Sequence, residues 1–531
     1  MKKILSIILA GAFIIGALGA CAQTPSQPAP PASVQPAPSQ PGAAPAPTPT
    51  PPPAEAPLGR GITIATQNEA PSIAPARHNA MAGGYKNLLT HNGLFRVSAS
   101  NLDPVPDLVE SWAAVSDTVF EFTIYDNIMF HNGDNMTAYD IAASLEYVRT
   151  TPDARSAHFS IESWEVVDTY TIRLSTGDEP NAQLFADLAH TGNFIMPLSL
   201  IEAGHDFNTQ PVGSGPFVFE EWRFGDFLRF SAFEDYFDAE RSPNVEYTLW
   251  RIIPEGAART IALETGEVDF VVEVAFADVP RLQGESGITV YTGSGAGHNQ
   301  LLLNTSLPIF EDINVRRAID MAIDREAIVL AGFNGLAIPT SQQTPPIFDG
   351  ASSQGLREFD PEAARAILAE NGIDPATLSF DIIADNEDRR RMGEVVQSNL
   401  LDIGIETTIT MNDLATSLSR MTDGDFEAAF AGFTSASLLG FMRSVLTTEP
   451  DRENRSRIDV PEINELVLAA VNVMDTNERN AMLYEASILA NEHVGLIPTH
   501  MAMIIRAFNS NLVVPEISAV GNMQFNMVFW E

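Results

Sequence analysis

The side chains that could do chemistry in this sequence are an excess of carboxylates, nine histidines and a single cysteine, Cys21. Asp and Glu number 69, so a close pair of carboxylates is expected by chance and does not indicate acid–base catalysis. No Gly-x-Ser-x-Gly elbow and no His-Glu-x-x-His pattern occurs, and the later chain offers no cysteine nucleophile. The histidines are scattered without a close ligand pair, which argues against a bare metal ion. The residue types therefore predict neither an enzyme nor a cofactor.

Two short motifs look chemical and are better explained as turns. His131 stands in His-Asn-Gly-Asp, and no second histidine follows at metal-ligand spacing, so a tight turn is favoured over a metal role. Residues 212–217, Val-Gly-Ser-Gly-Pro-Phe, are glycine-rich but lack the Gly-Lys-Ser/Thr ending that a phosphate loop needs. Neither motif predicts a metal or nucleotide site.

The formal net charge is −39, and Lys86 is the only lysine after Lys3. A surface of this sign repels nucleic acid and anionic lipid, so we expect neither as a partner. The charge suits a protein that works outside the cytoplasm, and it does not identify a ligand.

The N-terminus has the features of a bacterial lipoprotein signal over residues 1–20. Two lysines precede an apolar run, Ile4–Leu18, which is too short for a typical membrane-spanning helix. The run leads into Leu-Gly-Ala-Cys, the form of a lipobox, so Cys21 is the expected lipidation site and mature N-terminus. Cleavage after Ala20 with an incidental cysteine is the alternative. We expect an extracytoplasmic protein tethered to the cell membrane only by its lipid, and periplasmic if the cell has two membranes.

Residues 21–59 are dominated by Pro, Ala, Ser and Thr, a composition that cannot bury a core and favours extended conformations. We interpret this segment as a stalk, although a tail without a spacing role would have the same composition. The rest of the 531 residues are too many for a single core, so two or more lobes are expected.

Strand–helix–strand patterns in both halves of the remaining chain predict an α/β fold. In the first half, residues 62–66 read as a strand and residues 120–125 alternate strictly. In the second half, residues 360–362 (Asp-Pro-Glu) start a capped helix, and residues 380–384 and 405–411 read as strands.

Residues 300–330 combine a strand, a break and a helix. Leu301–Leu303 is a short apolar run fit for a buried strand, and Pro308 then interrupts the chain. Asp312 or Asn314 can cap the following helix, whose apolar residues recur at helical spacing. The charged residues fall mostly on the other face: Arg316, Arg317, Asp320, Asp324 and Arg325. This pattern fits either a passage between lobes or an ordinary strand–loop–helix unit.

Taken in order, the motifs resemble the extracytoplasmic solute-binding proteins of ABC importers, specifically the peptide-, oligopeptide- and nickel-binding class (family 5), over about residues 60–510. The strongest part of the resemblance is Asn304-Thr, Val315-Arg-Arg-Ala and Ala322-Ile-Asp-Arg. The other matching segments are residues 93–94, 106–112, 130–133, 137–141, 212–217, 236, 263–269, 360–364 and 401–405.

The resemblance implies a two-lobed α/β fold like that of periplasmic binding proteins, with a hinge and an extra subdomain inserted in lobe one. Lobe one would comprise residues 60–303, with the subdomain at about 96–204, and residues 498–531. Lobe two would comprise residues 304–497. Ligand would be enclosed by hinge closure, without chemistry or a cofactor. We expect a monomer that hands its solute to the permease subunits of an importer.

One departure from the family pattern concerns the amine of a peptide ligand. Peptide-binding members carry Gly-Trp and then an acidic segment whose Asp pairs with the peptide α-ammonium. In this chain Gly432-Phe433 is followed by no acid until Glu449, and a buried ammonium without a carboxylate is costly. Some dipeptide binders hold the ligand carboxylate with an arginine. In this chain Ile383 aligns with that position, and Arg389–Arg391 are expected to be exposed on a helix.

The predicted function is a lipid-anchored substrate-binding component of an ABC transporter that captures di- or oligopeptides. The alternative keeps this role with an oligosaccharide, an opine-like compound or a metal chelate as ligand, because the amine-pairing acid is absent. A secreted hydrolase is a third hypothesis, which the missing catalytic motifs disfavour. The candidate ligand-binding residues, each of which could equally be an ordinary loop or core residue, are Asn68, Tyr85, Gln300, Asn304, Asn412, Phe433, Thr434 and Ser435.

Overall fold

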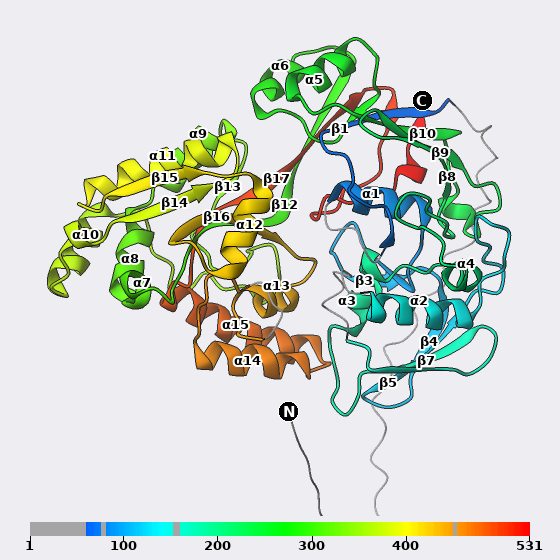
Figure 1. The fold of residues 1–531 in the computed structure, drawn as a ribbon, viewed down its shortest axis with the longest axis horizontal. Helices are drawn as coiled ribbons and strands as arrows, with labels where there is room; N and C mark the ends of the chain where they lie inside the picture. The colour runs from blue at the N-terminus through cyan, green and yellow to red at the C-terminus, as the bar shows by residue number, and fades with distance from the viewer. Residues whose placement is uncertain (1–59, 76–80, 152–159, 450–453) are drawn as a thin grey trace, which may run out of the picture. The chain divides into compact units, whose positions relative to one another are not determined.

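The structure, a computed structural model, describes residues 60–75, 81–151, 160–449 and 454–531 (Figure 1). The signal segment, Cys21 and the proline-rich segment lie outside these residues. The described chain forms a mixed 11-stranded sheet with helices packed on it, so the predicted α/β class is confirmed. The strand order is β15-β14-β16-β12-β17-β11-β1-β10-β9-β8, and β13 pairs with β17 off this path.

One end of the large sheet, which we call the β8 end, is built around β1 (Ile62–Thr66). Strand β1 lies parallel to both of its neighbours, β10 and β11. Its side chains Ile62 and Ile64 share a core with Trp250 and Phe270. The other elements of this end are β8 (Phe217–Arg223), β9 (Phe227–Ala232), β10 (Tyr247–Ile252), β11 (Phe270–Val271), α1 (Met81–Thr90), α5 (Gly256–Glu264), η4 (Phe276–Asp278) and α6 (Val279–Leu282).

Between α1 and β8 the chain forms a separate four-stranded sheet, ordered β4-β5-β7-β6, with its own core. The strictly alternating strand of this region is β5, and its side chains Phe120 and Phe122 enter that core. A helix of this region begins directly after Thr137, and Asp140 accepts from the Thr137 N–H at 2.8 Å. These elements are β2 (Phe95–Val97), β3 (Pro104–Pro106), β4 (Val109–Ala114), β5 (Val119–Ile124), α2 (Ala138–Thr150), β6 (Ser163–Val166), β7 (Thr171–Ser175), α3 (Leu184–Leu188) and α4 (Leu198–Glu202).

The opposite end of the large sheet, the β15 end, has β14 (Phe380–Ala384) parallel to β15 (Thr407–Met411) and β16 (Ala428–Thr434). Successive residues such as Ile382 and Ile383 point to opposite faces, so a core lies on each face. Helices of the first core are α7 (Pro308–Glu311), α8 (Ile313–Ala322), α9 (Arg325–Phe333), α10 (Pro361–Glu370) and α11 (Glu387–Asp402). Helices of the second are α12 (Leu414–Asp423), α13 (Leu438–Val445), α14 (Pro461–Val471) and α15 (Thr476–His493).

Two long antiparallel strands, β12 (Ile288–Leu303) and β17 (Leu496–Asn509), belong to both ends of the sheet. The later half of β12 also pairs with β16, whereas the later half of β17 pairs with β11. The sequence predicted only Leu301–Leu303 as a strand, because residues 293–297 (Gly-Ser-Gly-Ala-Gly) have low β-propensity. Within this segment Gly293 and Ser294 pair with β17 and Gly297 pairs with β16, while a register shift against β17 lies between Ser294 and His298.

Helix α8 confirms the predicted cap and corrects the predicted charged face. Asp312 accepts from the Asn314 N–H at 2.8 Å, and the apolar face is buried. Arg316 and Asp320 are also buried, because the other side of α8 packs against protein rather than water. Arg325, which is buried too, belongs to the next helix, α9.

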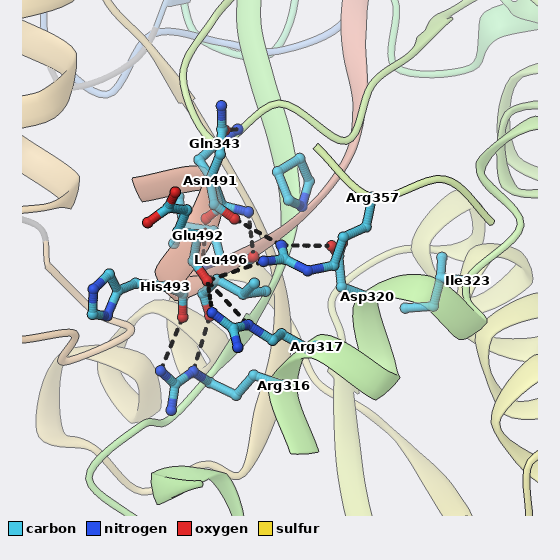
Figure 2. A network of polar contacts seen from close by, with 12 residues as sticks. Arg316, Arg317, Asp320, Ile323, Gln343, Arg357, Asn491, Glu492, His493 and Leu496 are labelled. Atoms are coloured by element: carbon cyan, nitrogen blue, oxygen red, sulfur yellow. Dashed lines mark hydrogen bonds and ion pairs between the residues drawn. The ribbon is translucent and has the colours of Figure 1, made fainter. Parts of the chain in front are cut away.

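These buried charges anchor the end of α15, from which β17 starts (Figure 2). Arg316 donates to the carbonyls of His493 and Val494 at 2.9 and 3.0 Å, and Arg357 donates to the Asn491 carbonyl at 2.7 Å. Asp320 forms ion pairs with Arg325 and Arg357. Val494 has a positive φ of 51°, which is unfavourable for a β-branched residue. The arginines therefore fix a strained helix end at the base of β17.

Candidate ligand-binding site

Two adjoining pockets flank the long strands where the two ends of the sheet meet. The Gln300 pocket has a volume of about 210 Å³, and the Glu273 pocket has a volume of about 490 Å³. Phe276, Asp388 and Met503 line both of them. Each pocket has walls from the β8 end, from the β15 end and from β17, so a solute in either one would touch both ends of the sheet.

The carboxyl ends of parallel strands supply polar groups to these pockets. Strand β14 ends at Ala384, and Asn386 then caps α11, whose first turn carries Asp388 and Arg389. Strand β11 is followed two residues later by Glu273. Ligands of open α/β sheets bind outside the carboxyl ends of the strands, so the sheet positions these groups where a ligand is expected.

Neutral polar groups line much of the Gln300 pocket. Gln300 Oε1 lies 2.8 Å from His298 Nδ1, and His298 Nε2 lies 2.8 Å from the Gln342 carbonyl. Burial lowers the pKa of His500 to about 3, and His298 and Arg389 shift this pKa in the same direction. Both rings are therefore neutral at physiological pH, since burial also lowers the pKa of His298. The half-buried Arg389 supplies the pocket's guanidinium and pairs with Asp385.

Charged side chains dominate the Glu273 pocket. The Glu273 carboxylate accepts from the Gln67 N–H at 3.0 Å and lies 3.4 Å from the Thr66 hydroxyl, so the end of β1 holds it. The charged residues that line the pocket are Arg259, Glu273, Asp388, Arg391 and Arg506.

The predicted residues Asn68, Tyr85 and Asn304 do not line these pockets. Asn68 is exposed in the bend after β1. Tyr85 is buried against Trp250, and its hydroxyl accepts from Arg506 at 3.0 Å. Asn304 is buried beyond the end of β12 and donates to the carbonyls that precede β16.

The remaining predicted residues lie near the carboxyl ends of β15 and β16, apart from Gln300, which lines the pocket named after it. Phe433 lines a small pocket together with Gln300. Thr434 is exposed at the end of β16, and Ser435 bonds within its own turn to Ser437. Asn412 follows β15, and its Nδ2 is buried without a hydrogen-bond partner in the described residues.

Sequence reasoning missed several charged residues of these pockets. Arg506 was detectable as a lone charge within the apolar run of β17, and Glu273 as an acid directly after a buried strand. Arg389 and Arg391 are half-buried rather than exposed, because the first turn of α11 packs at the pockets. Ile383, which aligns with the carboxylate-binding arginine of some dipeptide binders, is a core residue.

The described residues offer little for metal binding or membrane insertion. They contain no group of three or more His, Cys, Asp or Glu side chains placed to hold a metal ion. None of their helices combines the length and apolar character needed to cross a membrane. His131, weighed above as a turn residue, lies 2.8 Å from the Gly215 carbonyl through its Nε2.

Comparison with known proteins identifies the class of this fold and site. Residues 103–444 match the middle region of the bacterial extracellular solute-binding proteins, family 5. The glutathione-binding protein GsiB of Salmonella paratyphi A is 24% identical over 422 residues, which are 76% of this chain and 82% of that protein.

Solved structures share the fold at low sequence identity. The periplasmic binding protein DppA from Helicobacter pylori in complex with the peptide STSA has a TM-score of 0.78 and 21% identity, covering 89% of this chain and 98% of that one. AgaA from A. tumefaciens R10 in complex with agropinic acid has a TM-score of 0.77 and 22% identity, covering 89% and 99%.

The chain belongs to the family 5 bacterial extracellular solute-binding proteins. Its role is therefore that of a substrate-binding component of an ABC transporter, acting outside the cytoplasm. Members of this family bind small solutes for delivery to permease partners and are transport components rather than enzymes.

Proposed function

We propose that this protein is a lipid-anchored, monomeric receptor that captures di- or oligopeptides and delivers them to the permease of an ABC importer. The observation that carries the proposal is the pair of pockets whose walls come from both ends of the sheet. A solute there bridges two cores that are joined through β12 and β17. Such an arrangement suits capture by closure rather than chemistry.

The two ends of the sheet correspond to the two lobes in this proposal. Lobe one comprises residues 60–303, with the separate four-stranded sheet as its insertion at about 96–204, and residues 498–531. Lobe two comprises residues 304–497. The pairing of β12 with β17 supports a hinge at these strands, because the register shifts near residues 294–300 interrupt an otherwise continuous ladder.

Native mass spectrometry of protein released from its own cells tests peptide capture. We expect a co-purified peptide, or a set of peptides of similar length, that is lost on denaturation. Calorimetry with the identified peptide should give one site per chain. Protein that is consistently loaded with a sugar or a metal chelate would contradict the peptide proposal and leave the transport role intact.

A non-peptide solute is the second candidate, and one feature of the sequence favours it. Residues 432–439 contain no carboxylate to pair with a peptide ammonium. The solved relatives include one in complex with agropinic acid and one in complex with Ni(L-His)2, so this fold accommodates other solutes. A thermal-shift screen of peptides, oligosaccharides, opine-like compounds and metal chelates separates the two candidates.

The lipid anchor is tested by changing Cys21 to Ser. We expect the unmodified protein to take up radiolabelled palmitate and to sediment with membranes, whereas Cys21→Ser takes up none and is released. A matched Ser26→Ala variant should behave like the unmodified protein. Palmitate in the Cys21→Ser protein would contradict anchoring at this residue.

A further inference from the structure

The charges around the Glu273 pocket do not balance. Three arginines and two carboxylates line it, in a chain in which Asp and Glu outnumber Lys and Arg by 69 to 30. The side chain of Lys86, which is fully buried, adds a further cation near enough to interact with Glu273. The wall of this pocket is therefore locally basic in a strongly acidic protein.

Two of the arginines are buried cations that form no ion pair with a carboxylate of the described residues. Arg259 is 3% exposed and donates to the backbone carbonyls of Glu273 and Ile253 at 2.9 and 2.7 Å. Arg506 is 8% exposed and donates to the Val272 carbonyl at 2.7 Å. Carbonyl oxygens satisfy the N–H donors of both arginines without neutralising them, and Glu273 and Glu255 offset the charge of Arg259 only from a distance.

Lys86 adds to this imbalance. Its Nζ has no hydrogen-bond partner in the described residues and lies 4.3 Å from the centre of the Trp250 ring. Burial lowers the pKa of Lys86 to about 8, and the nearby Glu273 opposes that shift. The amine is therefore still mostly protonated at neutral pH, and Glu273 is the acid that acts on it.

We propose that the solute bound between the two ends of the sheet has a net negative charge, with a carboxylate additional to any peptide C-terminus, held in the Glu273 pocket between Arg391 of α11 and the buried Arg259 and Arg506. This inference rests on the proposed function, because it names the ligand class of the same site. A carboxylate would supply the missing negative charge through short, charge-assisted hydrogen bonds. It would also explain why residues 432–439 carry no acid, since a further carboxylate near the ligand would repel it.

The origin of the arginines gives the anion a second role in closure. Arg391 belongs to the β15 end, whereas Arg259 belongs to the β8 end and Arg506 to β17. Arg391 pairs with Asp388 on its own helix, but the three arginines still outnumber the two carboxylates of the pocket. Narrowing the pocket therefore brings excess positive charge from the two lobes together, which opposes closure when no anion is present. A bound carboxylate turns this repulsion into attraction, so the closed state depends on the charge of the ligand.

Calorimetry with three peptides of equal length tests this inference: Ala-Glu-Ala, Ala-Gln-Ala and Ala-Lys-Ala, with citrate as a carboxylate that is not a peptide. We expect Ala-Glu-Ala to bind at least about tenfold more tightly than Ala-Lys-Ala, with a preference that falls at high salt. The Arg391→Gln variant should lose most of this preference, and Arg391→Lys should keep part of it.

Arg390→Gln is the matched control, because Arg390 lies on the same helix, pairs with Glu387 and Glu394, and does not line the pocket. Equal or tighter binding of Ala-Lys-Ala, or an unchanged preference in a folded Arg391→Gln protein, overturns the anion proposal while peptide capture stands. If citrate binds, no peptide binds, and citrate binding is weakened in Arg391→Gln, the anion proposal is supported and peptide capture is overturned. A natively co-purified solute without an acidic group overturns the anion proposal in every case.

Discussion

At the scale of single residues, His131 has a structural role that can be measured. Its Nε2 lies 2.8 Å from the Gly215 carbonyl, and its ring meets Phe233 edge-on, with the ring centres 4.9 Å apart. Burial lowers the pKa of His131 from 6.5 to about 4, so the ring is neutral in the folded protein at physiological pH. Between these two pH values the unfolded chain binds more protons than the folded chain does.

The free energy of unfolding should therefore decrease as the pH is lowered through this window. The contribution of His131 is fully present above about pH 6.5 and is lost towards about pH 4, at up to about 1.4 kcal/mol per pH unit. Urea unfolding at several pH values should give a shallower dependence for His131→Gln than for the unmodified protein. The buried His298 and His500 contribute equally to both proteins, so the difference reports His131 alone. Identical pH dependence in the two proteins would show that His131 is not held neutral.

Single residues were also the hardest feature to predict from the sequence. Gln300, one of the predicted ligand-binding residues, does line a pocket. Arg259 and Arg506 were not predicted as pocket residues. A buried arginine needs backbone carbonyls as hydrogen-bond acceptors, and only the fold brings those carbonyls to it. Arg506, for example, donates to Val272, 234 positions away. The residues next to Arg506 in the sequence give no indication of such a distant hydrogen-bond partner.

At the scale of elements, Arg316 ties α8 to the end of α15. Its guanidinium donates to four carbonyls at 2.7–3.0 Å. Two belong to α7 (Phe310 and Glu311), and two lie at the end of α15 (His493 and Val494). Its neighbour Arg317 reaches only the Glu492 carbonyl, and that contact is exposed (Figure 2). The two arginines therefore form a natural pair for comparison.

Replacing Arg316 with Met should destabilise the protein by about 3 kcal/mol, because buried carbonyls lose their donor. Arg317→Met should cost less than about 1 kcal/mol, since water replaces the exposed contact. Guanidinium unfolding of both variants measures the difference. Equal losses in the two variants would contradict the anchoring role of Arg316.

Most elements were predictable because they are locally consistent. The strand at residues 380–384 was predicted at its observed bounds, and the caps of α8 and α10 lie at Asp312 and Asp360 as expected. Strand β12 was not predictable at its true length, since its glycine-rich part is flanked and held by pairing with β16 and β17, which are remote in the sequence.

At the scale of the whole molecule, β12 and β17 would give the proposed closure a defined axis. The two strands pair from Ile288 to Leu302, and the pockets lie beside this ladder. Residues from both ends already meet at Phe276 and Phe333, whose ring centres are 5.2 Å apart. A solute that bridges the ends should favour the more closed arrangement.

Small-angle scattering should therefore show a smaller radius of gyration for residues 60–531 when the native solute is added. The change should saturate at one solute per chain and be absent with a solute that does not bind. Deleting the segment before residue 60 keeps the stalk from dominating the signal. An unchanged radius under saturating solute would contradict capture by closure.

The two-lobed plan was inferred from family resemblance rather than from periodicity. Strand–helix–strand patterns indicate an α/β fold, but they do not say which strands share a sheet. That information lies in pairings such as Ile64 with Phe270, which are 206 positions apart. The proposed ligand site is harder still to predict, because it is assembled from α5, α11, β17 and the segments that follow β1 and β11.

The buried lysine has a practical consequence for anyone handling this protein. Lys86 is the only lysine in the described residues, and its side chain is fully buried on α1. Amine-reactive dyes and cross-linkers should therefore leave the folded residues 60–531 unmodified and label them only when the β8 end opens. The rate at which Lys86 is modified, measured by intact mass spectrometry, would then report the rate of unfolding. Immobilisation for binding measurements should use carboxyl coupling or an added tag.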